Sequence, residues 1–119
     1  MSTPGKWILV VEDDDDNREV MVEFLNDSGY AAKGVSGGEA AIEVLLKETP
    51  ALVLADLFMD DMDGRELLTR ARSLSLAAPP PFVFVTGAHP AKLEDTSCVV
   101  LEKPVDLKRL LGVVAHHCC

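Results

Sequence analysis

Short apolar runs alternate along the chain with longer segments whose apolar residues recur every three or four positions. The short runs are rich in β-branched residues and predict five strands, at residues 6–11, 31–35, 52–55, 82–85 and 98–101. The helical spacing predicts amphipathic helices over residues 17–27, 37–47, 65–73 and 107–116. Strands and helices therefore alternate, and the run at 31–35 is the weakest of the predicted strands.

Residues at the ends of these helices support their boundaries. Ser28 and Gly29 are expected to end the first helix, because glycine accepts the left-handed backbone of a helix C-terminus. Ser36 is expected to cap the second helix, with Glu39 three residues later as in a capping box. Asp106 is expected to cap the last helix.

Apolar strands of this kind are typical of a parallel sheet that is covered by helices on both faces. The alternation predicts a doubly wound, flavodoxin-like α/β fold, a five-stranded parallel sheet in the order 2-1-3-4-5. Only eleven residues, 87–97, join the last two strands. The fourth helix of the fold, expected there, should therefore be short or irregular. No linker or repeat is visible, so residues 1–119 are expected to form one domain.

Composition and charge narrow the class of protein. Apolar residues make up 48% of the 119 residues, enough for one buried core. The net charge of −9 and the absence of a basic cluster argue against nucleic acid or an anionic membrane as a partner. The apolar run at 7–11 is too short for a membrane span or a signal peptide. Three cysteines do not suggest a disulfide framework and indicate a reducing, cytoplasmic compartment.

Chemically active side chains follow the predicted strands. Glu12 and Asp13 come after the first strand, Asp56 after the third, Thr86 after the fourth and Lys103 after the fifth. Because ligands of open parallel sheets bind at the carboxyl ends of the strands, these side chains should meet in one cleft. A hard cation would relieve the repulsion between the carboxylates, and Mg²⁺, which keeps several waters, fits so few oxygen ligands better than Ca²⁺.

Five blocks of sequence resemble the signatures of receiver domains of two-component response regulators, the CheY-like family. They occur in the family's order and cover the whole chain: ILVVEDD at 8–14, LADL at 54–57, MDG at 62–64, VTG at 85–87 and EKP at 102–104. The resemblance implies a stand-alone signalling domain that receives a phosphoryl group from a sensor histidine kinase or a histidine phosphotransfer protein. Its output would be contact with a downstream protein or onward phosphotransfer, with no turnover of an external substrate.

The resemblance also implies roles for individual residues. Asp56 would be the phosphoacceptor, and a Mg²⁺ ion, for which Mn²⁺ could substitute, would bind to Glu12, Asp13, Asp56 and the backbone carbonyl of Phe58. Separately, Thr86 and Lys103 would each contact a phosphoryl oxygen.

Three departures from the family pattern keep an alternative open, a pseudo-receiver that docks to partners without phosphorylation. Asp60 stands where proline is usual, Val100 stands where an aromatic residue is usual, and the fourth helix is expected to be short. None of them removes a side chain that the phosphorylation chemistry needs.

Two other functions, a phosphatase and a flavin-binding module, fit the sequence less well. A haloacid-dehalogenase-type phosphatase needs a second acid at the position of Phe58, and a flavin-binding loop would not be acidic, as residues 12–16 are.

Two other clusters suggest metals but fit no usual site. Asp60, Asp61 and Asp63 do not match the ligand spacing of an EF-hand loop. The terminal residues 116–119, two histidines and two cysteines, cannot converge on zinc while helical, and we expect a frayed terminus there. The acidic residues 14–16 are expected to lie in the first turn of the first helix.

Overall fold

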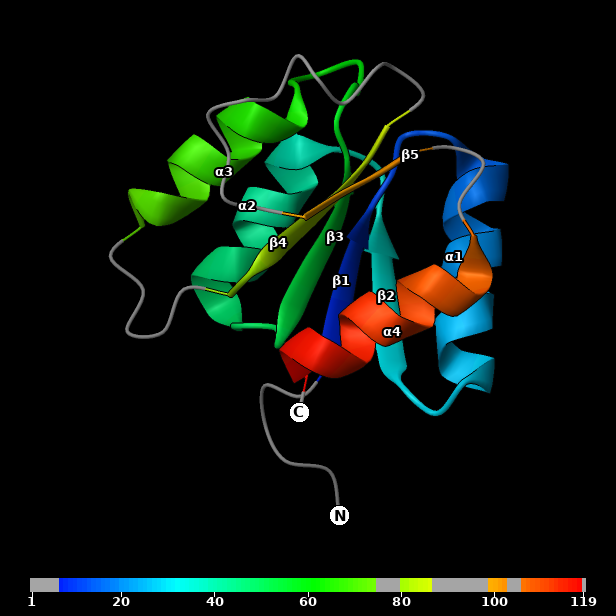
Figure 1. Cartoon of the computed structure of the whole chain (residues 1–119). Helices are drawn as coiled ribbons and strands as arrows, with labels where there is room; N and C mark the ends of the chain where they lie inside the picture. The colour runs from blue at the N-terminus through cyan, green and yellow to red at the C-terminus, as the bar shows by residue number, and fades with distance from the viewer. Residues whose placement is uncertain (1–6, 75–79, 87–98, 103–105, 119) are drawn as a thin grey trace.

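The computed structural model describes residues 7–74, 80–86, 99–102 and 106–118. Its centre is a parallel sheet of five strands in the order β2-β1-β3-β4-β5, the order predicted from the sequence (Figure 1). The strands are β1 (Trp7–Val11), β2 (Ala31–Val35), β3 (Leu52–Asp56), β4 (Phe82–Thr86) and β5 (Val99–Glu102). The helices are α1 (Asp15–Asp27), α2 (Gly38–Lys47), α3 (Gly64–Arg72) and α4 (Leu107–Cys118). The short helix expected between β4 and β5 falls outside the described residues.

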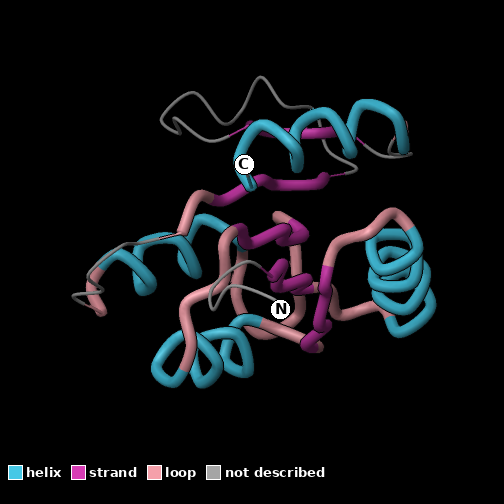
Figure 2. The backbone as a smooth tube through the Cα atoms, turned by 90° about the horizontal axis from the view of Figure 1, so that it is seen from below, coloured by secondary structure: helices cyan, strands magenta, loops and turns pink. Residues whose placement is uncertain are grey.

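Helices cover both faces of the sheet, with α2 and α3 on one face and α1 and α4 on the other (Figure 2). Side chains of a strand point alternately to the two faces. In β1, Leu9 and Val11 belong to the core under α2 and α3. Ile8 and Val10 belong to the core under α1 and α4. The chain therefore buries apolar side chains on both faces, as a parallel sheet requires.

Strand β2 departs from this pattern. Three of its five residues are exposed and none is fully buried, so the prediction that the strands are buried on both faces is wrong for β2. The strand lies at the edge of the sheet and lacks large apolar side chains. The aliphatic part of the Arg18 side chain, from α1, lies against Gly34 of this strand. A Cβ atom added at Gly34 would lie 2.8 Å from the Cγ atom of Arg18.

The N-terminus of α2 also differs from the prediction, because Ser36 does not cap it. The N-cap residue is Gly37, which has an extended backbone and no side chain that could accept a hydrogen bond from the helix. Asp61 takes this role from a distant part of the sequence, since its carboxylate accepts hydrogen bonds from the amides of Gly38 (3.1 Å) and Glu39 (3.0 Å). A Cβ at Gly37 would lie 2.8 Å from the Asp61 Oδ1 atom, so glycine leaves room for this carboxylate.

The other helix ends agree better with the sequence. Asp14 caps α1 by accepting the amide of Asn17, and Gly29, with φ of 98°, follows its C-terminus as predicted. Asp106 caps α4, also as predicted, by accepting the amide of Lys108 at 2.9 Å. The C-terminus expected to fray is instead helical as far as Cys118. Within the described residues, none of the helices combines the length and apolarity needed to cross a membrane.

Candidate functional site

The carboxyl ends of β1 and β3 bring three acidic residues together. Glu12 directly follows β1, and Asp56 is the last residue of β3. Both are only 8% exposed, although carboxylates are rarely buried in proteins. With the half-buried Asp13 they form a cluster in which one carboxylate oxygen from each residue lies within 4.8 Å of the others. The sequence prediction that these three side chains meet is therefore confirmed.

This donor set fits a hard divalent cation. Mg²⁺ binds oxygen at about 2.1 Å, so two ligands on opposite sides of the ion lie about 4.2 Å apart. The observed spread of up to 4.8 Å is only slightly wider. A small adjustment of one side chain, or a water between it and the ion, would close the difference. Because Mg²⁺ gives up its waters reluctantly, a site with few protein ligands suits it.

Backbone hydrogen bonds fix the segments that carry Glu12 and Asp56. The Glu12 amide donates to the carbonyl of Val35 in β2 at 3.1 Å, and its carbonyl accepts a hydrogen bond from the Arg18 side chain at 3.0 Å. Beyond Asp56, the Leu57 amide donates to the carbonyl of Val85 at 2.9 Å, so the ladder between β3 and β4 continues past the site. Both acidic residues are therefore held in place by hydrogen bonds at the carboxyl end of the sheet.

Thr86 ends the neighbouring strand β4 and is completely buried. In the ladder between β3 and β4, Asp56 pairs with Val85, so Thr86 is one residue beyond the partner of Asp56. The prediction that Thr86 lies at the same carboxyl end of the sheet as the acidic cluster is confirmed. Lys103 follows the last residue of β5, but lies outside the described residues.

Phe58 lies beside the acidic cluster through its backbone. Its amide donates a hydrogen bond to Oδ1 of Asp56 at 3.2 Å. Phe58 is 56% exposed, so its ring lies at the surface two residues after the buried Asp56.

Asp13 is held by a residue for which sequence reasoning found no such role. Its Oδ2 atom accepts a hydrogen bond from the backbone amide of Asp60 at 3.0 Å. The two residues are 47 positions apart, so local sequence patterns give no sign of the contact. Proline, the residue expected here from the family pattern, has no amide hydrogen and could not form this bond. The departure at position 60 thus adds a contact to the acidic cluster.

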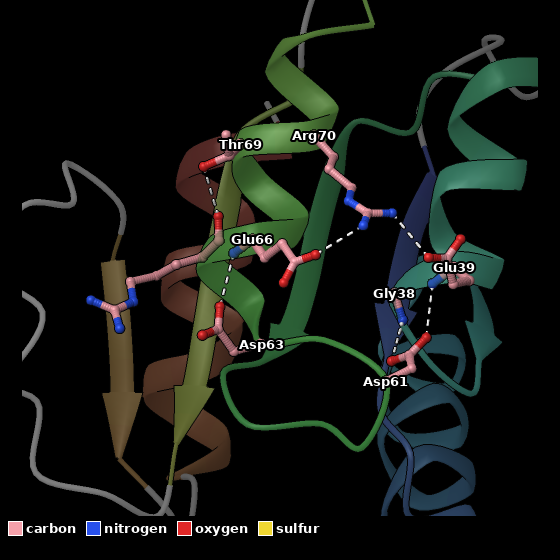
Figure 3. A network of polar contacts seen from close by, with 8 residues as sticks. Gly38, Glu39, Asp61, Asp63, Glu66, Thr69 and Arg70 are labelled. Carbon is pink, nitrogen blue, oxygen red and sulfur yellow. Dashed lines mark hydrogen bonds and ion pairs between the residues drawn. The ribbon is translucent and has the colours of Figure 1, made fainter.

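A polar network joins the segment after β3 to α2 and α3 (Figure 3). Asp61 accepts the amides at the start of α2. Nearby, Arg70 of α3 forms ion pairs with Glu39 of α2 and with Glu66, both at 2.9 Å. The amide of Glu39, followed by that of Gly38, holds the pKa of the Asp61 carboxyl below its usual value, while slight burial acts in the opposite direction. The exposed ion pairs of Arg70 contribute little to the stability of the fold by themselves.

Comparisons with known proteins identify the family and agree with the fold. Residues 8–115 match the response regulator receiver domain family. The chain is 34% identical over 114 residues to the response regulator receiver protein CpdR of Brucella abortus, covering 92% of this chain and 93% of that protein. It is 37% identical over 120 residues to the sensor histidine kinase RcsC of Salmonella typhimurium, covering 96% of this chain but 13% of the kinase.

Solved structures give the same result. The crystal structure of a response regulator receiver protein from Pseudomonas putida superposes with a TM-score of 0.85 at 30% identity, and each chain is covered to 98%. The receiver domain of the hybrid histidine kinase CckA superposes with a TM-score of 0.79 at 31% identity, covering 94% of this chain and 98% of that domain. The chain therefore belongs to the response regulator receiver domains of two-component signalling systems.

Proposed function

We propose that this receiver accepts a phosphoryl group on Asp56, in a transfer that depends on Mg²⁺, from the phosphohistidine of a sensor histidine kinase or a histidine phosphotransfer protein. The observation that carries the proposal is the buried Asp56 carboxylate within 4.8 Å of the carboxylates of Glu12 and Asp13. A protein rarely buries acidic groups this close together without a cation or a chemical role for them. The domain would act in the cytoplasm and signal by contact with a downstream protein or by onward phosphotransfer.

The proposed chemistry is an in-line displacement at phosphorus. An oxygen of Asp56 forms the new P–O bond, the P–N bond to the donor imidazole breaks, and the electron pair of that bond leaves with the imidazole nitrogen. The transfer needs positioning and charge neutralisation more than covalent assistance. The sheet supplies the positioning, because Asp56 and Leu57 are held in the ladder to β4.

Each neighbouring group has a role in this proposal. The metal would be held by Glu12, Asp13, Asp56 and the carbonyl of Phe58, and when bound it neutralises charge on the transferring phosphoryl group. Thr86 would orient one phosphoryl oxygen through its hydroxyl, and Lys103 would pair with another. Without a cation to balance their charge, the buried carboxylates would repel the negatively charged phosphoryl group. The proposal therefore predicts that transfer fails without a divalent cation.

Phosphorylation in vitro tests the proposal. The protein is incubated with acetyl phosphate and Mg²⁺, and the intact mass is measured. We expect the protein to gain one phosphoryl group in the presence of Mg²⁺. Labelling should fail when EDTA removes the metal before the donor is added, and it should return when Mn²⁺ is supplied. Asp56→Asn should abolish labelling, because an amide is a poor nucleophile. Asp16→Asn removes the same charge from the exposed start of α1 and should label normally.

Two results would contradict the proposal. If the mass increase survives Asp56→Asn, another residue is the acceptor. If neither acetyl phosphate nor any histidine kinase labels the wild-type protein, the chain is better described as a pseudo-receiver that docks without phosphorylation.

A further inference from the structure

The segment that connects β3 to α3, residues 57–63 and named here the β3–α3 loop, is tied to the rest of the domain at several points. At its start the Phe58 amide bonds to Asp56, and at its end Asp63 caps α3 by accepting the Glu66 amide at 2.8 Å. Between these ends, Asp60 and Asp61 each form a hydrogen bond with a different element. Functional residues often lie on loops that a scaffold holds in a fixed position, as these contacts hold the β3–α3 loop.

Asp61 is the contact between this loop and α2. One of its carboxylate oxygens accepts the Gly38 amide, and the other accepts the Glu39 amide. Both amides are in the first turn of a helix, where no intrahelical acceptor is available and where the helix dipole favours a negative charge. Gly37, the N-cap residue, has no side chain that could replace Asp61.

Packing reinforces the same contact. Met62, the next residue of the loop, is 5% exposed, and its side chain lies against Gly38 so closely that a Cβ there would overlap it. The polar and apolar contacts of Asp61 and Met62 therefore fix the loop against the same turn of α2.

The residue before Asp61 reaches the acidic cluster. The Asp60 amide donates to Oδ2 of Asp13 at 3.0 Å. The Asp60 amide belongs to the peptide unit between Met59 and Asp60, one residue before Asp61. The contacts that Asp61 and Met62 make with α2 restrain the backbone next to this amide, and the amide bonds to the Asp13 carboxylate. Groups that orient a metal-binding carboxylate from behind are known to affect metal affinity.

We propose that Asp61 is a positioning residue of the metal site: by capping α2 it fixes the β3–α3 loop, and through the Asp60 amide the loop orients the carboxylate of Asp13. This inference rests on the proposed function, because it takes Glu12, Asp13 and Asp56 as the metal site. In the described part of the chain, the Asp61 carboxylate forms its hydrogen bonds with Gly38 and Glu39 and none with Glu12, Asp13 or Asp56. Its effect on metal binding is carried by the loop, not by its charge.

Mg²⁺ affinity and amide exchange test the inference without any phosphodonor. Affinity is measured by calorimetry, because the single tryptophan, Trp7, lies at the start of β1, the opposite end from the site. Exchange at the amides of Gly38, Glu39 and Asp60 is measured by NMR. Asp61→Ala should speed exchange at the Gly38 and Glu39 amides by about fivefold to thirtyfold, as expected for the loss of such hydrogen bonds. It should also speed exchange at the Asp60 amide, whose bond to Asp13 is then less well restrained. It should weaken Mg²⁺ binding about three- to tenfold, less than the loss of a direct outer-shell partner.

Matched variants separate position from charge. Asp61→Asn keeps one acceptor oxygen and should lie between wild type and Asp61→Ala. Asp16→Ala removes one negative charge from an exposed residue whose side chain forms no hydrogen bond or ion pair among the described residues, and should change the affinity less than twofold. Asp60→Ala keeps the backbone amide, whereas Asp60→Pro removes it. Asp60→Pro should therefore bind Mg²⁺ more weakly than Asp60→Ala.

Unchanged Mg²⁺ affinity in Asp61→Ala, or an equal loss in Asp16→Ala, would overturn the inference while leaving the proposed function intact. So would faster exchange at Gly38 and Glu39 with no change at Asp60, because the loop would then not carry the effect. If Asp61→Ala does not fold, Asp61→Asn and the two Asp60 variants decide the question in the same way. A wild-type protein that binds no Mg²⁺ would instead overturn the proposed function, and the inference with it.

Discussion

Gly64, the first residue of α3, occupies a position at which a side chain would meet the core. A Cβ placed there would lie 2.8 Å from Cε1 of Phe84, 3.0 Å from its Cδ1 and 3.1 Å from the Cα atom of Leu57. Phe84 is completely buried, so its ring has little room to move away. The Gly64 amide also donates to the Leu57 carbonyl at 2.6 Å, which holds α3 close to β3. Gly64→Ala therefore forces either the ring or the start of α3 to shift.

The magnitude follows from two opposing effects. Adding one methyl group to a packed core typically costs about 1–3 kcal/mol. Alanine is a better helix former than glycine by up to about 1 kcal/mol, but less at the first helical position. We expect Gly64→Ala to lower the free energy of unfolding by about 1–2 kcal/mol. For a domain of this length, this corresponds to a fall in Tm of about 4–8 °C.

Gly112 provides the matched control, because it is an exposed glycine within α4 and a Cβ there would meet nothing within 4 Å. Gly112→Ala should raise the free energy of unfolding by about 0.5–1 kcal/mol through helix propensity alone. Urea unfolding at equal slope gives both values. Phe84→Leu should recover part of the loss in a double-mutant cycle with Gly64→Ala. If Gly64→Ala is as stable as the wild type, or shows no coupling to position 84, the steric argument is wrong.

Two further predictions concern the β3–α3 loop. Phe58→Asn should shorten the lifetime of the phosphorylated protein, because it replaces the apolar side chain two residues after Asp56 with a group that attracts water. The decay of the phosphorylated mass after removal of the donor measures this lifetime, and a longer lifetime would contradict the prediction. Asp61→Asn should destabilise the fold at neutral pH but not in acid. The Glu39 amide, with that of Gly38, holds the folded-state pKa of Asp61 below its ordinary value. The contribution of Asp61 is therefore present above the ordinary pKa and lost as the pH falls through the lowered one. Urea unfolding between pH 7 and pH 3 should show the difference between the two proteins narrow as the pH falls, and a difference that grows in acid would refute the assignment.

Much of the fold could be predicted from the sequence, because its strands and helices are marked by strong local patterns. Runs such as 52–55 and 82–85 are apolar throughout, and the structure places both in the sheet with every residue buried. Strand β2 is the exception, since its sequence contains a lysine and a glycine and its exposure depends on its place at the edge. Edge position is a property of the topology, which a single run of residues does not reveal.

The acidic cluster could be predicted for a related reason. In a parallel sheet the carboxyl ends of neighbouring strands meet, so the position of a residue just after a strand fixes its place in space. Glu12 and Asp56 follow this rule, and β1 and β3 are adjacent in the sheet. The cap of α2 could not be predicted in this way. Ser36 and Glu39 matched a capping box locally, but Asp61, from the loop after β3, bonds to the helix instead.

The acidic residues after β3 show what such a cluster can do when it is not a calcium loop. The spacing of Asp60, Asp61 and Asp63 argued against an EF-hand, and in the structure each forms a hydrogen bond with a backbone amide or with another carboxylate. Asp61 and Asp63 accept amides at the starts of α2 and α3, and Asp60 donates its own amide to Asp13. A negative charge at the start of a helix is stabilised by the helix dipole, so two of these charges are used to hold helices. The third residue matters through its backbone, which a proline could not provide. The loop can therefore be strongly acidic beside the proposed cation site without contributing its side chains to the cluster of Glu12, Asp13 and Asp56.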